Sequence, residues 1–175
     1  MDITNAISTA RLLLEPLSES DSEFIIELLN TEGWIKFIGN RNIHSIADAI
    51  AYIQKINGNK NITYWTVKLK DTKNSQIGLV TLIKRDYLEH NDIGFAFLPQ
   101  FYAKGYAYEA ANAVLSYLSK NKLATNILAE TLPENTSSIK LLEKLGLRFE
   151  KEMEIENETL HIYEASLAKY LFPFQ

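Results

Sequence analysis

The sequence contains no cysteine, which excludes disulfides, thiolate metal sites and a cysteine nucleophile, and is compatible with a reducing cytoplasm. Its three histidines, His44, His90 and His161, lack paired metal-ligand spacing, so we predict no metal site. Long hydrophobic runs are also missing, because none approaches the roughly 20 residues that span a bilayer. Residues 1–10 lack the basic start and apolar core of a signal peptide. We therefore expect a cytoplasmic protein with no membrane partner.

An excess of basic residues is absent too. The formal net charge is −4, and a mildly acidic chain does not predict a nucleic acid or an anionic membrane surface as its partner. Apolar residues make up 46% of the chain and charged residues 23%, a composition that indicates a folded core rather than disorder. The four prolines mark no linker, and no segment is repeated or of low complexity. We predict a single domain over residues 1–175.

Hydrophobic periodicity predicts alternating blocks of strand and helix. Strands are predicted at residues 11–17, 63–69, 76–84, 93–98, 127–130, 147–155 and 160–167. Helices are predicted at residues 22–30, 46–58, 106–120 and 136–145, the second beginning at a Ser45/Asp48 capping box and the last ending at Gly146. Residues 33–40 read as a turn anchored by Trp34. This order predicts a mixed α/β (α+β) domain.

The segment between the fourth strand and the third helix contains a turn with a glycine and small residues. A strand that enters a helix through such a turn leaves free N–H groups at the positive end of the helix dipole, where a phosphate can bind. Gly105 permits a positive φ and a close approach of the ligand, and Lys104 adds a positive charge. A plain loop before a helix that packs on the sheet has the same local pattern, so the turn alone does not decide the function.

The wider sequence resembles the GNAT superfamily of acetyl-CoA-dependent N-acetyltransferases. Its pyrophosphate signature, Gln/Arg-x-x-Gly-x-Gly/Ala, is matched by Gly105 and Ala107, with Tyr102 at the Gln/Arg position. That departure is common in the RimJ/RimL-like branch of ribosomal-protein N-terminal acetyltransferases. The resemblance covers about residues 9–168 and includes the segments 9–17, 92–95 and 135–147.

The resemblance implies a fold and a cofactor site. It implies a mostly antiparallel sheet of six to seven strands, flanked by about four helices, with strands four and five parallel and splayed so that pantetheine lies between them. The backbone of Phe97 and Leu98 is expected to bond the pantetheine amides. The pyrophosphate is expected on the N–H groups of Lys104, Gly105, Tyr106 and Ala107. Acetyl-CoA is thus the implied co-substrate.

The resemblance also implies catalytic roles, and each has a structural alternative. Asp92 stands where relatives carry a glutamate that removes the amine proton, and its shorter side chain favours a relay through water. The resemblance to the ribosomal-protein branch implies Ser138 as a proton donor near the thiol. Leu142 occupies the position of the donor tyrosine that many relatives have, so the donor is Ser138, another side chain or water, and Ser138 could equally be an ordinary helix serine. Asn135 is expected to bind cofactor or substrate, although asparagine is also a favoured helix N-cap. Asp92 could equally be a hydrogen-bonded carboxylate at a strand end.

The implied acceptor pocket draws on Trp34, Trp65, Arg85 and Tyr87. For the aromatic residues the alternative is core packing, and for Arg85 it is a solvated cation at a strand end.

Together these features favour acetyl transfer to a primary amine, either a protein N-terminus such as that of a ribosomal protein or a small molecule. Two other classes stay open. One is a GNAT-shaped module that binds CoA as a sensor. The other is a nucleotide-binding enzyme that uses the turn for ATP or NAD, although the sequence has neither Gly-x-x-x-x-Gly-Lys-Ser/Thr nor Gly-x-Gly-x-x-Gly. A monomer and a homodimer are both compatible with the sequence.

Overall fold

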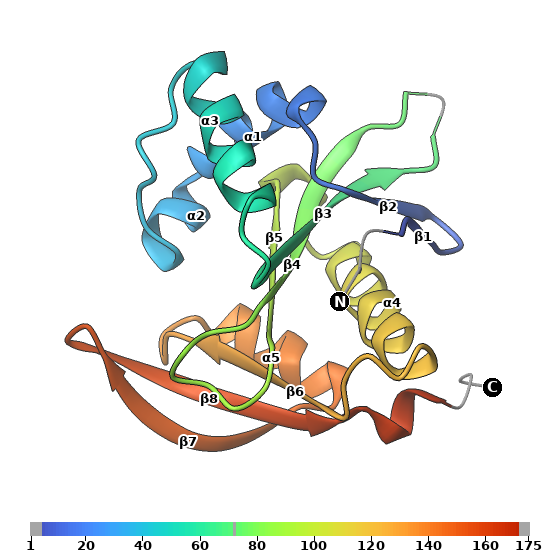
Figure 1. Cartoon of the computed structure of the whole chain (residues 1–175), viewed down its shortest axis with the longest axis vertical. Helices are drawn as coiled ribbons and strands as arrows, with labels where there is room; N and C mark the ends of the chain where they lie inside the picture. Colours follow the sequence, from blue (N-terminus) through green and yellow to red (C-terminus); the bar gives the residue numbers. More distant parts are fainter. Residues whose placement is uncertain (1–4, 72, 172–175) are drawn as a thin grey trace.

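A computed structural model describes residues 5–71 and 73–171 and shows an eight-stranded sheet in the order β1-β2-β3-β4-β5-β6-β8-β7 (Figure 1). The strands are β1 (Ile7–Ser8), β2 (Leu12–Pro16), β3 (Ile62–Leu69), β4 (Gln76–Ile83), β5 (Asp92–Phe97), β6 (Asn126–Thr131), β7 (Arg148–Ile155) and β8 (Glu158–Ser166). Every neighbouring pair is antiparallel except β5 and β6, which run parallel.

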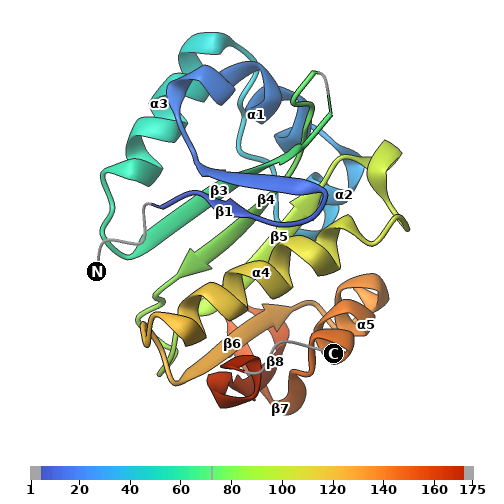
Figure 2. The same cartoon turned by 90° about the vertical axis from the view of Figure 1, so that its right-hand side faces the viewer.

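Helices cover the sheet on both faces (Figures 1 and 2). They are α1 (Ser22–Leu29), α2 (Glu32–Phe37), α3 (Ile46–Asn57), α4 (Tyr106–Lys120) and α5 (Thr136–Leu145), with short 3-10 turns η1 (Glu19–Asp21), η2 (Pro99–Phe101) and η3 (Leu167–Leu171). The first three helices pack on one face around Phe24, Ile53 and Leu79. Helices α4 and α5 pack on the other face, around Val114 and Leu142.

The long helices begin and end where their capping residues predict. Ser45 accepts a hydrogen bond from Asp48 N at the start of α3, and the Asp48 carboxylate accepts one from Ser45 N, which completes the capping box. Gly146 ends α5 with φ +89°, a left-handed conformation that glycine adopts without strain. The capping residues therefore set these helix ends as predicted.

The predicted fold class is confirmed as well, because the domain is mixed α/β and its sheet contains the splayed parallel pair.

One short α-helix and one short strand were not predicted. Residues 32–37 form α2 rather than a turn, because the Thr31 hydroxyl accepts a hydrogen bond from Trp34 N and caps the helix. The two-residue β1 pairs with β2 at Leu13 and Leu14. Within the described residues, the sheet consequently has eight strands rather than six or seven, and five α-helices flank it rather than four.

The parallel pair meets at one register, where Asp92 lies opposite Leu128. There Leu128 N donates to the carbonyl of Asn91 at 2.9 Å. The next donor along β6, the Glu130 N–H, bonds the Asp92 carboxylate Oδ1 at 3.1 Å instead of continuing the ladder. The two strands diverge from this point toward their carboxyl ends, where α4 and α5 begin.

No helix within the described ranges combines the length and apolar character that crossing a membrane requires.

Candidate active site

The turn between β5 and α4 presents a row of backbone donors. Gly105 is the N-cap of α4 with φ +79°, and Ala103 also has a positive φ, of 57°. The first backbone bond of the helix joins Glu109 N to the Gly105 carbonyl at 3.0 Å. Among the described residues, none accepts a hydrogen bond from the N–H groups of residues 104–107. Such a concave set of donors at a helix start suits a diphosphate.

An ion pair holds this turn in shape. Arg11 Nε lies 2.6 Å from Glu109 Oε2, and Arg11 Nη1 donates to the Lys104 carbonyl at 3.1 Å. Glu109 Oε1 also accepts from Thr9 Oγ1 at 2.6 Å. Burial alone would raise the pKa of Glu109, but the bonds from Thr9 and Arg11 outweigh it and lower that pKa. Neither Arg11 nor Glu109 was predicted to have a role, and the two residues lie 98 positions apart in the chain.

The free edge of β5 faces the gap between β5 and β6. In an antiparallel ladder, successive residues direct their backbone N–H and C=O groups to opposite edges. Leu98 N donates to the Ile77 carbonyl on the β4 side at 2.9 Å, so Phe97 and Phe95 direct theirs toward the gap. The backbone groups of Phe97 and Phe95 therefore face the gap, whereas the N–H of Leu98 is engaged by β4.

A charged network lies where the gap closes, and we call it the Arg85 network: Arg85, Tyr87, Asp92 and Glu130. Arg85 Nε donates to Asp92 Oδ2 at 2.8 Å, and Arg85 Nη2 lies 2.7 Å from Glu130 Oε1. The Tyr87 hydroxyl donates to Glu130 Oε2 at 2.8 Å. Three separate segments thus contribute to one cluster of two carboxylates around a guanidinium.

Burial dominates the electrostatics of this network. It raises the pKa of Asp92, against the lowering effect of Arg85. The pKa of Glu130 is raised by burial and by the charge of Asp92, again against Arg85. Burial and the bond to Glu130 raise the pKa of Tyr87 to about 12, so its phenol is neutral at ordinary pH.

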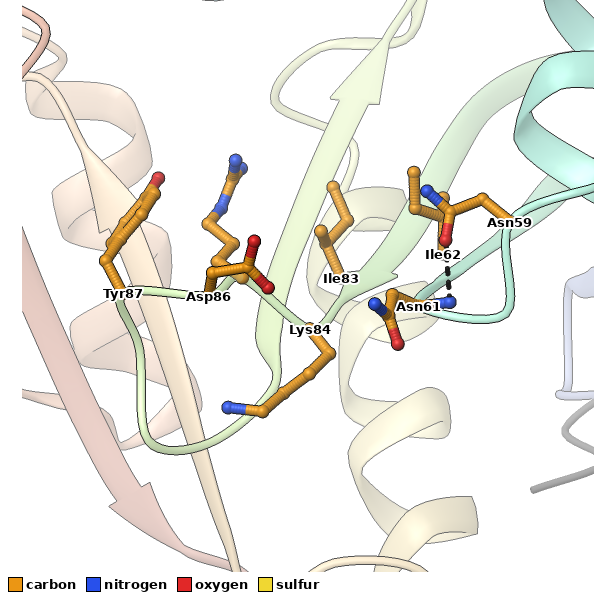
Figure 3. Close-up of a pocket in the computed structure, with 8 residues that line it drawn as sticks. Asn59, Asn61, Ile62, Ile83, Lys84, Asp86 and Tyr87 are labelled. Carbon is orange, nitrogen blue, oxygen red and sulfur yellow. Dashed lines mark hydrogen bonds between the residues drawn. The ribbon is translucent and has the colours of Figure 1, made fainter.

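A pocket of about 260 Å³ adjoins the network (Figure 3). It is lined by Asn59, Asn61, Ile62, Ile83, Lys84, Arg85, Asp86 and Tyr87. Lys84 Nζ donates to the carbonyls of Leu88 and Glu89, which engages its charge outside the pocket. Besides Arg85, whose guanidinium is paired with Asp92 and Glu130, the pocket presents two amides, a phenol and the Asp86 carboxylate, a lining that suits a polar or cationic molecule.

The predicted residues on α5 lie at the start of that helix. Asn135 Oδ1 accepts from Ser138 N at 3.2 Å, so Asn135 is the N-cap of α5. Ser138 is half-buried in the first turn. Because α5 follows β6 as α4 follows β5, both residues stand at the wide end of the gap.

The two tryptophans are core residues. Trp65 has no exposed surface and packs beneath α4, on the face opposite the Arg85 network. Trp34 is 4% exposed and packs with α1 and α3. Of the four expected acceptor residues, the structure thus brings only Arg85 and Tyr87 together with Asp92. Glu130 was missed, although an acidic residue at the end of the apolar strand 127–130 was a usable signal.

Comparison with known proteins agrees with this arrangement. Residues 11–148 match the family model described as an acetyltransferase (GNAT) domain. The chain is 33% identical over 145 residues to the uncharacterized N-acetyltransferase YnaD of Bacillus subtilis (strain 168), covering 82% of this chain and 83% of YnaD.

Solved structures share the fold. An acetyltransferase of the GNAT family from Bacillus anthracis superposes with a TM-score of 0.78 at 29% identity, over 93% of this chain and 99% of that one. RimL, a ribosomal L7/L12 alpha-N-protein acetyltransferase in complex with coenzyme A, gives a TM-score of 0.79 at 12% identity, over 93% and 98% of the two chains. At 12% identity the likeness concerns the fold alone.

Proposed function

The chain belongs to the acetyltransferase (GNAT) family, and from that premise we propose that it transfers an acetyl group from acetyl-CoA to a primary amine while both are bound. Acetyl-CoA supplies a thioester whose carbonyl carbon receives the amine nitrogen and whose sulfur leaves as a thiolate. The observation that carries the proposal is one opened pair of parallel strands with free backbone donors at its wide end and the Arg85 network where it closes.

The residues that would hold acetyl-CoA follow from the free groups of the backbone. The N–H groups of residues 104–107 would bind the diphosphate. The backbone N–H and C=O groups of Phe95 and Phe97 would form hydrogen bonds with the pantetheine amides. The side chain of Lys104 is exposed, with its ammonium 5.5 Å from the Phe101 ring centroid, and adds a positive charge beside the diphosphate.

Proton transfer needs one acceptor and one donor. An ammonium must lose a proton before its nitrogen can attack, and a carboxylate of the Arg85 network would take it. Leu142 is 1% exposed in the core and has no proton to give, so we propose Ser138, at the start of α5, as the group that returns a proton to the thiolate.

The acceptor would enter through the pocket beside Arg85 and Tyr87. A volume of about 260 Å³ suits a compact amine or the first residue of a peptide. The resemblance to the ribosomal-protein branch supports a protein N-terminus, and the Asp86 carboxylate in the pocket supports a small molecule with a second cationic group. We propose both as substrate classes to be compared.

An amine panel tests the function directly. The protein is incubated with acetyl-CoA and a set of N-terminal peptides, amino acids and polyamines, while thiol release and product mass are measured. Acetylated product is the expected result. If acetyl-CoA raises the melting temperature but no amine releases thiol, the protein is a CoA-binding module instead. Stabilisation by ATP or NAD but not by CoA would refute the acetyltransferase proposal.

A further inference from the structure

The two carboxylates of the Arg85 network are placed differently, although either could take a proton by its chemistry alone. Asp92 is 3% exposed, and both of its oxygens are occupied: Oδ2 by Arg85 and Oδ1 by the Glu130 N–H. Its second bond replaces the next bond of the parallel ladder. Asp92 thus takes up a donor that the ladder would otherwise use, and it is not among the residues that line the pocket.

Glu130 has a path to the pocket that Asp92 lacks. Its side chain is 15% exposed, and its Oε2 accepts a hydrogen bond from the Tyr87 hydroxyl. Tyr87 is 40% exposed and lines the pocket. A phenol oxygen that donates one hydrogen bond can still accept another, so an ammonium in the pocket can donate to Tyr87 Oη.

We propose that Glu130 is the proton acceptor of the reaction and that Tyr87 relays the proton to it, an inference that rests on the function proposed above. The ammonium gives its proton to Tyr87 Oη, while the phenolic proton passes to Glu130 Oε2. The amine is then neutral, Tyr87 is again a phenol, and Glu130 is a neutral acid that returns its proton to solvent between turnovers. Asp92 is the positioning residue that keeps the strands open and Arg85 in place.

The charges around Glu130 define how this step depends on pH. Asp92 faces it from β5, and Arg85 and Tyr87 face it from the β4–β5 loop. Glu164 on β8 lies on the same side of the sheet and is bonded to Asn126. Burial and Asp92 raise the pKa of Glu130 above the ordinary value of 4.5, so activity should fall as pH decreases through that raised value.

The test compares kcat against pH for Glu130→Gln and Asp92→Asn. Without its base, Glu130→Gln should lose about 100-fold in kcat at pH 7, within the range typical of general bases. Its rate should rise with the fraction of free amine instead of reaching a plateau. Asp92→Asn keeps an oxygen for the Glu130 N–H but removes a charge that raises the pKa of Glu130. The Asp92→Asn variant should still lose kcat as the pH falls, but this loss should occur at a lower pH than in the wild type.

Two further variants complete the kinetic comparison. Tyr87→Phe should lower kcat while leaving KM for acetyl-CoA unchanged, because it removes the relay and not the cofactor site. Glu143→Gln, an exposed carboxylate on α5, is the matched control for loss of one charge and should behave as wild type. The inference is overturned if kcat of Glu130→Gln still falls at low pH as it does in the wild type, or if this fall is abolished in Asp92→Asn.

A measurement without turnover separates this inference from the proposed function. Carboxyl ¹³C signals of glutamate-labelled free protein should include one that titrates above pH 4.5 and is missing from Glu130→Gln. A signal of Glu130 that titrates at or below 4.5 would overturn the inference. An active wild type with that result leaves the acetyltransferase function intact, whereas a wild type inactive with every amine defeats the function itself.

Discussion

Gly105 is the position at which the proposed diphosphate site can be tested most directly. Its φ of +79° lies in the left-handed region, where an ordinary side chain costs about 1–2 kcal/mol and asparagine less. A Cβ at this position would lie 3.4 Å from Arg11 Nη2, which is an ordinary contact. Gly105→Asn and Gly105→Asp should therefore fold, with the same shape and a difference of one negative charge.

That charge decides the expected result. Two like charges about 4 Å apart repel by roughly 1–4 kcal/mol at the dielectric of a protein surface. Arg11 offsets part of this repulsion, so we expect Gly105→Asp to bind acetyl-CoA about tenfold more weakly than Gly105→Asn at low salt, a difference of about 1.4 kcal/mol. This difference in affinity should become smaller as ionic strength rises, because salt screens exposed charges.

Isothermal titration calorimetry with acetyl-CoA at two salt concentrations measures this difference. Dephosphorylated pantetheine analogues, which lack the diphosphate, serve as the control ligand and should bind the two variants equally. If the Asp and Asn variants bind acetyl-CoA with the same affinity at low salt, the diphosphate does not lie on this turn and the site must be placed elsewhere.

Three other substitutions probe the supports of the site. Glu109→Gln should weaken acetyl-CoA binding and lower the melting temperature at pH 7; because the folded-state pKa of Glu109 is lowered, the difference from wild type should shrink as pH falls from 4.5 through that lower value, and a difference independent of pH would contradict it. Gly78→Ala should cost about 1–3 kcal/mol in urea unfolding, because the new Cβ would lie 2.7 Å from the Ala96 carbonyl. Asp92→Ala should cost about 3 kcal/mol, more than Asp92→Asn, because it leaves Arg85 half-paired and a buried N–H without an acceptor; equal unfolding free energies for the two variants would show that Asp92 does not hold the strands.

The features that the sequence predicted well are those set by nearby residues. The helix that Ser45 begins and the helix that Gly146 ends depend on contacts within one turn of helix. The Gly105 turn is similar, because its shape depends on a residue type and on the strand and helix that flank it. Helix α2 was not predicted, because six residues with a glycine near the start offer too few periodic positions to distinguish a helix from a turn.

The site residues that were missed depend on pairing between distant strands. Whether Phe97 or Leu98 faces the gap is decided by the register of β5 against β4, and a shift of one residue reverses the answer. Glu130 joins Arg85 only because β6 lies parallel to β5 in register with Asp92. Trp65 packs on the face of the sheet away from the Arg85 network, and Trp34 on α2 packs against α1 and α3. Both placements depend on tertiary packing that sequence positions do not reveal.

The Arg85 network also explains how a sheet can stay open at its centre. A gap between strands leaves backbone donors without partners, and filling it with apolar side chains would not satisfy them. Asp92 accepts the hydrogen bond of one such donor, the Glu130 N–H. A buried carboxylate is costly unless it is paired, and Arg85 provides the pairing charge. Arg85 in turn orients Glu130 through their ion pair, and the hydrogen bond from Tyr87 connects Glu130 to the pocket. An apolar core at these positions could be as stable, but it would let β5 and β6 continue their ladder and close the space in which we propose that the two substrates meet.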